Sequence, residues 1–121
     1  MTSLILVCGR SRAGKTTYCQ RFGRSEVLHL DNYGMLNYDG LLQAVARRRT
    51  DTVVDGIFHT RELRIRLLDL WGGSAKCIWL DTPIETVKGR LHPFIGGKVY
   101  PLEFEPPTYD EGWDEIVRLT C

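Results

Sequence analysis

The sequence lacks any long apolar run, since its longest stretch of consecutive apolar residues is the segment from Leu4 to Cys8. A helix that crosses a bilayer needs roughly 20 apolar residues, so we expect no membrane partner. The first residues, Met-Thr-Ser followed by a predicted strand, also lack the basic start and the cleavage site of a secretory signal peptide.

The sequence also has few cysteines and a net charge close to zero. The four cysteines show no C-x-x-C spacing and lie in or beside apolar runs, which disfavours a zinc site and favours unpaired thiols in a reducing compartment. The net charge of +1 does not indicate a nucleic-acid-binding protein. With 121 residues, 43% of them apolar, the chain is expected to form one compact domain over 1–121. We expect the protein to be located in the cytoplasm of a bacterial or phage-infected cell.

The sequence does contain a phosphate-binding motif. Residues 9–16, GRSRAGKT, match G-x-x-x-x-G-K-S/T at every fixed position, between an apolar run and a helical pattern. The two glycines let main-chain amides converge on phosphates, Lys15 can reach the β- and γ-phosphates, and the Thr16 hydroxyl can ligate Mg²⁺. The motif therefore predicts binding of ATP with Mg²⁺. The predicted nucleotide contacts are Gly9, Arg10, Ser11, Arg12, Ala13, Gly14, Lys15, Thr16 and Thr17.

Strand-like and helical segments alternate along the chain. Strands are predicted at 4–8, 26–30, 52–55, 75–80 and 115–120, and helices at 15–22, 39–48, 60–71 and 83–90. Residues 91–107 show no period and are predicted to form a loop, and Thr108-x-x-Glu111 is a possible capping box. The alternation predicts an α/β fold: a three-layer sandwich with a five-stranded, mostly parallel sheet.

Aspartates follow three of the predicted strands. In parallel sheets ligands bind at the carboxyl ends of the strands, where Asp31, Asp55 and Asp81 are expected. Asp81 directly precedes Thr-Pro and is interpreted as a turn or cap residue. For Asp31 and Asp55 we favour a functional role, because a carboxylate there can hold the Mg²⁺ shell or accept a proton from an attacking hydroxyl. His29 is interpreted as a core histidine.

Four segments together resemble one kinase family. The phosphate loop, HLDNY at 29–33, VVDGIFHTRELRIRLL at 53–68 and FEPPTYDEGWDEI at 104–116 are similar to P-loop kinases related to phage and animal polynucleotide 5′-kinases, with Trp113 where phenylalanine is usual. The resemblance covers nearly the whole chain. It implies a P-loop NTPase fold of the nucleoside-monophosphate-kinase type and an enzyme that transfers the γ-phosphate of ATP to an alcohol group.

The resemblance also implies roles for single residues in the first half of the chain. Lys15 contacts the phosphates as a catalytic residue and Thr16 ligates the metal. Asp31 matches the aspartate that accepts the proton of the acceptor hydroxyl. Asp55 matches an aspartate near the acceptor or the metal, and Arg64 matches an arginine that binds the acceptor.

Further implied roles fall in the second half. Arg90 is the best match to the lid arginine that neutralises the transferred phosphoryl group, with Lys88 and Lys98 as substitutes. The lid itself is expected near 91–100. Pro107, in the loop before the last strand, is expected to contact the adenine.

Two departures from the family pattern leave the acceptor open. Gly34 stands where polynucleotide kinases tend to carry an arginine, and the expected lid is short. Both departures disfavour a long polynucleotide, because phosphate contacts supply most of the affinity for nucleic acid. The main hypothesis is the 5′-hydroxyl of DNA or RNA, or a hydroxyl on a modified nucleotide in DNA. The alternatives are a kinase of a nucleoside, nucleotide or sugar, and a non-catalytic nucleotide-binding module.

Overall fold

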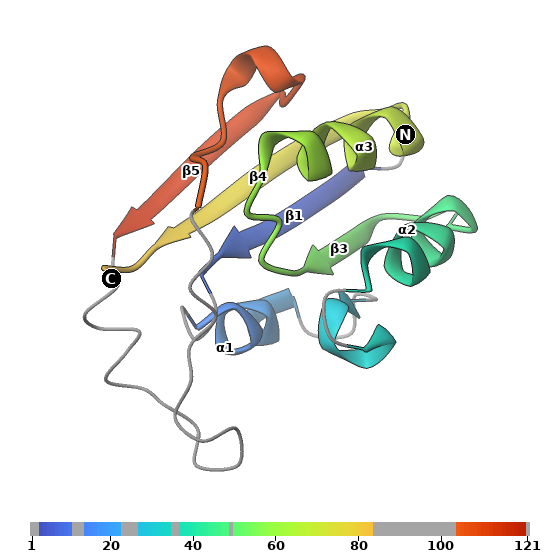
Figure 1. Cartoon of the computed structure of the whole chain (residues 1–121), viewed down its shortest axis with the longest axis horizontal. Coiled ribbons are helices and arrows are strands. Elements are labelled where there is room, and N and C mark those ends of the chain that lie inside the picture. Colours follow the sequence, from blue (N-terminus) through green and yellow to red (C-terminus); the bar gives the residue numbers. More distant parts are fainter. Residues whose placement is uncertain are drawn as a thin grey trace.

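The structure of the chain is a computed structural model that describes residues 3–10, 14–22, 27–34, 37–48, 50–83 and 104–120. In these ranges a five-stranded sheet has the order β2-β3-β1-β4-β5 (Figure 1). Every ladder is parallel, so the predicted α/β fold is confirmed with a sheet that is parallel throughout. The strands are β1 (Ser3–Gly9), β2 (Val27–His29), β3 (Thr52–Asp55), β4 (Ser74–Asp81) and β5 (Glu115–Thr120).

Local capping defines the two longer helices, α2 (Tyr38–Ala46) and α3 (Arg61–Trp71). The Asn37 side chain accepts a hydrogen bond from the amide of Gly40 at the start of α2, and Thr60 caps α3 in the same way. Gly72 ends α3 with a φ of 71°, a conformation that glycine adopts without steric cost. With 11 residues α3 is the longest described helix, and no helix in the described ranges could cross a membrane.

The shorter helices follow strand ends or lead into strands. Helix α1 (Lys15–Cys19) continues as a 3₁₀ turn, η1 (Gln20–Phe22), and a second 3₁₀ turn, η2 (Leu30–Tyr33), directly follows β2. A third turn, η4 (Tyr109–Glu111), begins at the predicted capping box of Thr108 and Glu111, which the structure confirms. The helix predicted at 83–90 and the lid predicted at 91–100 lie mostly outside the described residues.

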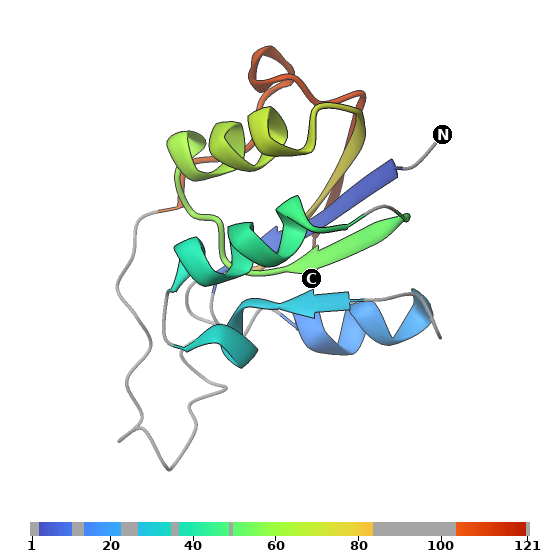
Figure 2. The ribbon, with the colours of Figure 1, turned by 90° about the vertical axis from the view of Figure 1, so that its right-hand side faces the viewer.

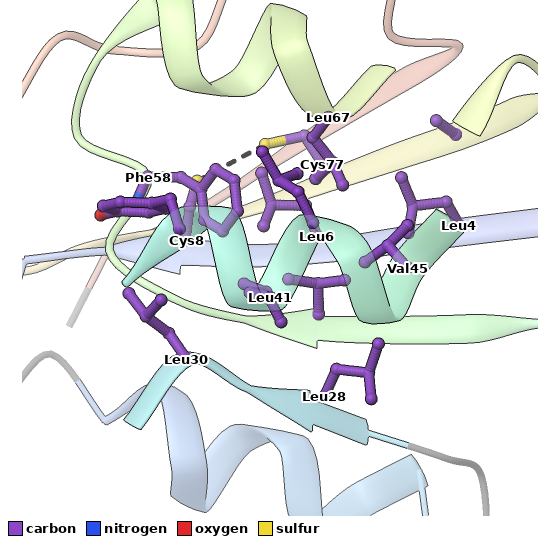
Figure 3. Packing of buried hydrophobic residues seen from close by; sticks show 14 of the residues in the cluster. Leu4, Leu6, Cys8, Leu28, Leu30, Leu41, Val45, Phe58, Leu67 and Cys77 are labelled. Atoms are coloured by element: carbon purple, nitrogen blue, oxygen red, sulfur yellow. Dashed lines mark hydrogen bonds between the residues drawn. The ribbon is translucent and has the colours of Figure 1, made fainter. Parts of the chain in front are cut away.

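Helices cover both faces of the sheet, as predicted. Helices α2 and α3 lie side by side over one face and enclose the larger core, in which Leu41 and Val45 of α2 face Leu4 and Leu6 of β1 (Figures 1, 2 and 3). The alternate residues of the strands point to the other face and pack with α1 through Cys19. The apolar run of β1 is thus buried on both sides, which explains its lack of polar alternation.

Candidate active site

The carboxyl ends of β1, β3 and β2 bring the phosphate loop and two acidic residues to one edge of the sheet. Residues Val7 of β1 and His29 of β2 are the two register partners of Asp55 in β3. Asp31 lies two residues beyond His29, in the turn η2. Asp55 therefore ends the strand next to β1, whereas Asp31 follows β2, one strand farther from the phosphate loop.

The phosphate loop leads from β1 into α1 through a glycine. Gly14 is the N-cap of α1 with a φ of 95°, so its backbone is left-handed, and it has no side chain that could cap the helix. The Gly14 carbonyl accepts the hydrogen bond of the Tyr18 amide, which starts the helix. Residues Ser11, Arg12 and Ala13 and the Thr16 side chain lie outside what the structure describes.

The Lys15 side chain is hydrogen-bonded to the phosphate loop. Its Nζ atom donates to the carbonyl of Arg10 over 2.8 Å. Burial lowers the pKa of Lys15 from its ordinary value, and the charges of Asp55 and then Asp31 act in the opposite direction. An ammonium group partly withdrawn from water and near two carboxylates is suited to bind the anionic oxygens of a triphosphate.

Asp55 is the buried carboxylate of the site. It is 5% exposed, and its Oδ2 atom lies 2.7 Å from Nδ1 of His29. Interpreting His29 as a core histidine missed this pair, because the two residues are 26 positions apart in the sequence. A signal was available: each residue stands at the end of a strand, and ends of neighbouring parallel strands can face each other.

Asp31 is exposed, in contrast to Asp55. The turn η2 is anchored by Leu30, which is buried under the Gly56–Phe58 loop, and Gly34 ends the turn with a φ of 99°. Asp31 is thus exposed to solvent on a packed turn, and it lies close enough to Lys15 for its charge to raise the pKa of the lysine. This placement is compatible with contact to a second, exchangeable molecule.

Cys19 is a buried thiol near Asp55 and Lys15. The residue is 3% exposed, and burial together with the charge of Asp55 raises the pKa of its thiol to about 12. The thiol therefore stays protonated and acts as a small apolar group. The three described cysteines, Cys8, Cys19 and Cys77, are free.

Arg64 differs from its expected role in acceptor binding. Its side chain is fully buried and donates four hydrogen bonds: two to Glu111 at 2.8 and 3.0 Å, one to the Phe58 carbonyl at 2.7 Å and one to the Pro106 carbonyl at 3.3 Å. Trp113 also donates to Glu111. These contacts assign Arg64 to the junction between α3 and the 104–113 segment rather than to a substrate.

The remaining expectations concern Asp81, Pro107 and the basic residues of the lid. Asp81, interpreted as a turn or cap residue, accepts hydrogen bonds from Arg118 on β5. Pro107 is buried in a segment whose Glu105 amide donates to His59, so it lies on the α3 side of the sheet, and its contact with adenine stays a prediction. Arg90, Lys88 and Lys98 lie outside the described residues.

The donor set fits a magnesium–nucleotide complex. Mg²⁺ prefers hard oxygen ligands and is usually held by one or two carboxylates together with substrate phosphates. Asp55 supplies one such carboxylate beside Lys15, and the Thr16 hydroxyl belongs to the same motif. The residues described at this edge are therefore compatible with a triphosphate and its metal.

No protein-family model and no curated protein matches the chain by sequence. Solved structures do share its fold. A gluconokinase from Sinorhizobium meliloti superposes with a TM-score of 0.65 and 17% identity, over 98% of this chain and 82% of that chain. The APS kinase of Mycobacterium tuberculosis, in complex with AMPPNP and APS, gives 0.67 and 17%, over 98% and 88%.

A third similar structure is Kti12 from Chaetomium thermophilum in complex with ADP-AlF3, with a TM-score of 0.67 and 15% identity over 97% of this chain and 88% of that chain. Two of these three structures hold nucleotide analogues. None of the three is described as a polynucleotide kinase. The superpositions and the strand order establish a P-loop kinase-like fold. Because the sequence identities are this low, they show the fold alone.

Proposed function

We propose that the chain is an ATP-dependent kinase that phosphorylates a hydroxyl group of a small molecule. The observation that carries the proposal is the grouping of Lys15, Asp55 and Asp31 at the carboxyl edge of the sheet. The charges of both carboxylates act there to raise the pKa of Lys15, against the effect of burial. The buried carboxylate suits the metal–nucleotide complex and the exposed one suits the acceptor. The similar folds of a gluconokinase and an APS kinase support a small acceptor.

In the proposed reaction the acceptor oxygen attacks the γ-phosphorus of ATP. The bond from that phosphorus to the β–γ bridging oxygen breaks, ADP leaves, and Asp31 takes the proton of the acceptor hydroxyl. Lys15 and the loop amides stabilise the charge on the phosphate oxygens. Asp55 and Thr16 would hold Mg²⁺, which neutralises charge on the β- and γ-phosphates when bound. Arg90 is proposed to approach the transferred group.

The arginines of α3 are a further argument for a small acceptor. Arg61 is paired with Asp110 at 2.8 Å, Arg64 with Glu111, and Arg66 with Asp39 at 2.9 Å. Cations already engaged by carboxylates contribute little to binding a phosphate backbone, which depends on available positive charge. The pairing of these arginines therefore favours a small acceptor over a nucleic acid bound along this helix.

The second candidate is a kinase of polynucleotide 5′-hydroxyl groups. It rests on the segments HLDNY and FEPPTYDEGWDEI, which resemble that family. In the structure most of the second segment forms the Arg64–Glu111 junction, so part of the resemblance reflects the fold rather than the acceptor.

An acceptor screen tests the proposal. The protein is incubated with Mg²⁺ and ATP labelled at the γ-phosphate, together with sugars, nucleosides and 5′-hydroxyl oligonucleotides in parallel, and Lys15→Ala serves as the inactive control. We expect label in a small acceptor with the wild type only. Label in oligonucleotides alone would establish the second candidate, and tight ATP binding without transfer to any hydroxyl would favour a non-catalytic module.

A further inference from the structure

His29 is in direct contact with Asp55 at the candidate site. The Nδ1 atom of His29 lies 2.7 Å from Oδ2 of Asp55, and the two residues are register partners on β2 and β3. The Asp55 side chain is 6% exposed and that of His29 is 30% exposed. The imidazole therefore lies at the outer side of the buried carboxylate. Lys15 lies close enough to that carboxylate for its charge to raise the pKa of the lysine.

We propose that His29 is a positioning residue that fixes the Asp55 carboxylate for the magnesium–nucleotide complex. The inference rests on the proposed function in one respect, namely that Asp55 belongs to the metal–triphosphate site. A carboxylate that ligates a metal is commonly oriented by a hydrogen bond from a neighbouring group. Here the Nδ1 atom of His29 is placed to donate a hydrogen bond to one oxygen of Asp55, which restricts the rotation of the carboxylate beside Lys15.

The surroundings of Asp55 indicate what such an orientation serves. Asp55 is 5% exposed and lies close enough to Lys15 and Cys19 for its charge to act on both. A carboxylate that rotates would hold a metal with poor geometry. A hydrogen bond from His29 on β2, an edge strand of the sheet, limits this rotation.

The alternative is that His29 only closes the edge of the sheet. In that case its replacement would weaken folding and would reduce nucleotide affinity equally with and without metal. A positioning role predicts a selective loss, because only the metal-dependent part of binding uses the orientation of Asp55. The placement of the donor atom then matters, and this can be tested by side chains of similar polarity.

The experiment measures the Kd of ATP in the full chain with Mg²⁺ and with EDTA, in the absence of any acceptor. The variants are His29→Leu, which removes the donor, His29→Asn, whose amide nitrogen occupies the place of Nδ1, and His29→Gln, whose amide nitrogen lies one bond farther out. We expect His29→Leu and His29→Gln to raise the Kd of Mg²⁺-ATP by about tenfold or more, with the EDTA value unchanged. His29→Asn is expected to stay within about threefold of the wild type.

Several results would overturn the inference. These are equal losses with Mg²⁺ and EDTA, no difference between the asparagine and glutamine variants, and a wild-type affinity that does not depend on Mg²⁺. If His29→Leu fails to fold, as judged by urea unfolding, the asparagine–glutamine pair decides. A failed acceptor screen with a selective Mg²⁺ effect would refute the kinase and retain His29, so the two failures are distinguishable.

Discussion

At the scale of single residues, Asp31 and Asp55 have different surroundings and should therefore give different phenotypes. Asp31 is exposed on η2, whereas Asp55 is buried and bonded to His29. We expect Asp31→Asn to lower kcat by about 10²–10⁴-fold, the usual contribution of a general base, with little change in the Kd of ATP. The check is steady-state kinetics on the acceptor found in the screen, with ATP binding measured by calorimetry.

Asp81→Asn is the matched control for this test. Asp81 also ends a strand, but its carboxylate accepts hydrogen bonds from Arg118 on the neighbouring strand. Its replacement should leave kcat within about threefold of the wild type, since surface ion pairs contribute little. Equal kcat values for the Asp31 variant and the wild type would refute the assignment of Asp31 as the base.

Lys15 makes stability depend on pH in the nucleotide-free protein. Its pKa in the folded state lies below the ordinary value of 10.5, first because of burial. Between these two pKa values the unfolded chain binds more protons at this position than the folded one, so the free energy of unfolding rises with pH in this window. The Lys15→Met variant lacks this contribution to the pH dependence of stability.

Urea unfolding of both proteins at a series of alkaline pH values provides the measurement. Relative to Lys15→Met, the wild type should gain stability as the pH rises from neutral toward 10.5. Unfolding curves that shift in parallel for both proteins would show that Lys15 has an ordinary pKa in the fold.

At the scale of elements, the loop between β3 and α3 couples the core to the site. Phe58 has a φ of 42°, which is unusual for a bulky residue, and its amide donates to the Tyr38 hydroxyl over 3.2 Å. Its ring packs over Gly56, where an added Cβ would lie 2.9 Å from the ring and 3.3 Å from the Cβ of Leu30. Leu30 directly precedes Asp31, so the packing of this loop sets the position of η2.

We expect Gly56→Ala to destabilise the fold by about 1–3 kcal/mol and to lower kcat as well, because Leu30 or Phe58 must move. Gly72→Ala is the matched control: its φ of 71° strains any side chain, but a Cβ there meets nothing within 4 Å and Gly72 lies at the far end of α3. It should cost about 1–2 kcal/mol and leave kcat unchanged. Loss of activity in both variants, or in neither, would contradict the coupling.

The Arg64–Glu111 pair joins α3 to the segment that leads into β5. Both side chains are fully buried, so removing one charge leaves the other without compensation. Glu111→Gln should lower the free energy of unfolding by about 3–5 kcal/mol, while the double variant Arg64→Met with Glu111→Leu recovers most of this loss. Chemical unfolding of the single and double variants measures the difference, and a double variant as unstable as the single one would refute this view.

The same pair predicts sensitivity to acid. Burial alone would raise the pKa of Glu111, but hydrogen bonds from Arg64 and Trp113 and the charge of Arg64 lower it below 4.5. The stabilisation is therefore present above the ordinary pKa of glutamate and is lost as the pH falls through the lowered value. The stability difference between wild type and Glu111→Gln should shrink in that range.

At the scale of the whole molecule, the sequence predicted most of the fold. The strand at 52–55 has the predicted bounds because it begins with three β-branched residues after the polar Asp51 and ends before a glycine. The last strand, 115–120, also has the predicted bounds. These are local patterns, in which each residue's preference agrees with the final structure.

Pairings between distant residues were not predictable in the same way. The His29–Asp55 contact requires that β2 lie next to β3, and the Arg64–Glu111 contact joins residues 47 positions apart. Strand order and buried ion pairs depend on tertiary packing, which no single segment encodes. Arg64 was accordingly expected to contact substrate, although a glutamate in a capping box near a tryptophan was a usable signal of a buried partner.

The most direct test of the account is a crystal structure with Mg²⁺ and a non-hydrolysable ATP analogue. The central claim is that one edge of the sheet holds the triphosphate between Lys15 and the two carboxylates. We predict the γ-phosphate within hydrogen-bonding distance of Lys15 Nζ, the metal next to Asp55, and the Asp31 carboxylate facing the γ-phosphorus across the acceptor space. A triphosphate bound elsewhere, or an Asp31 carboxylate turned away from it, would contradict the claim.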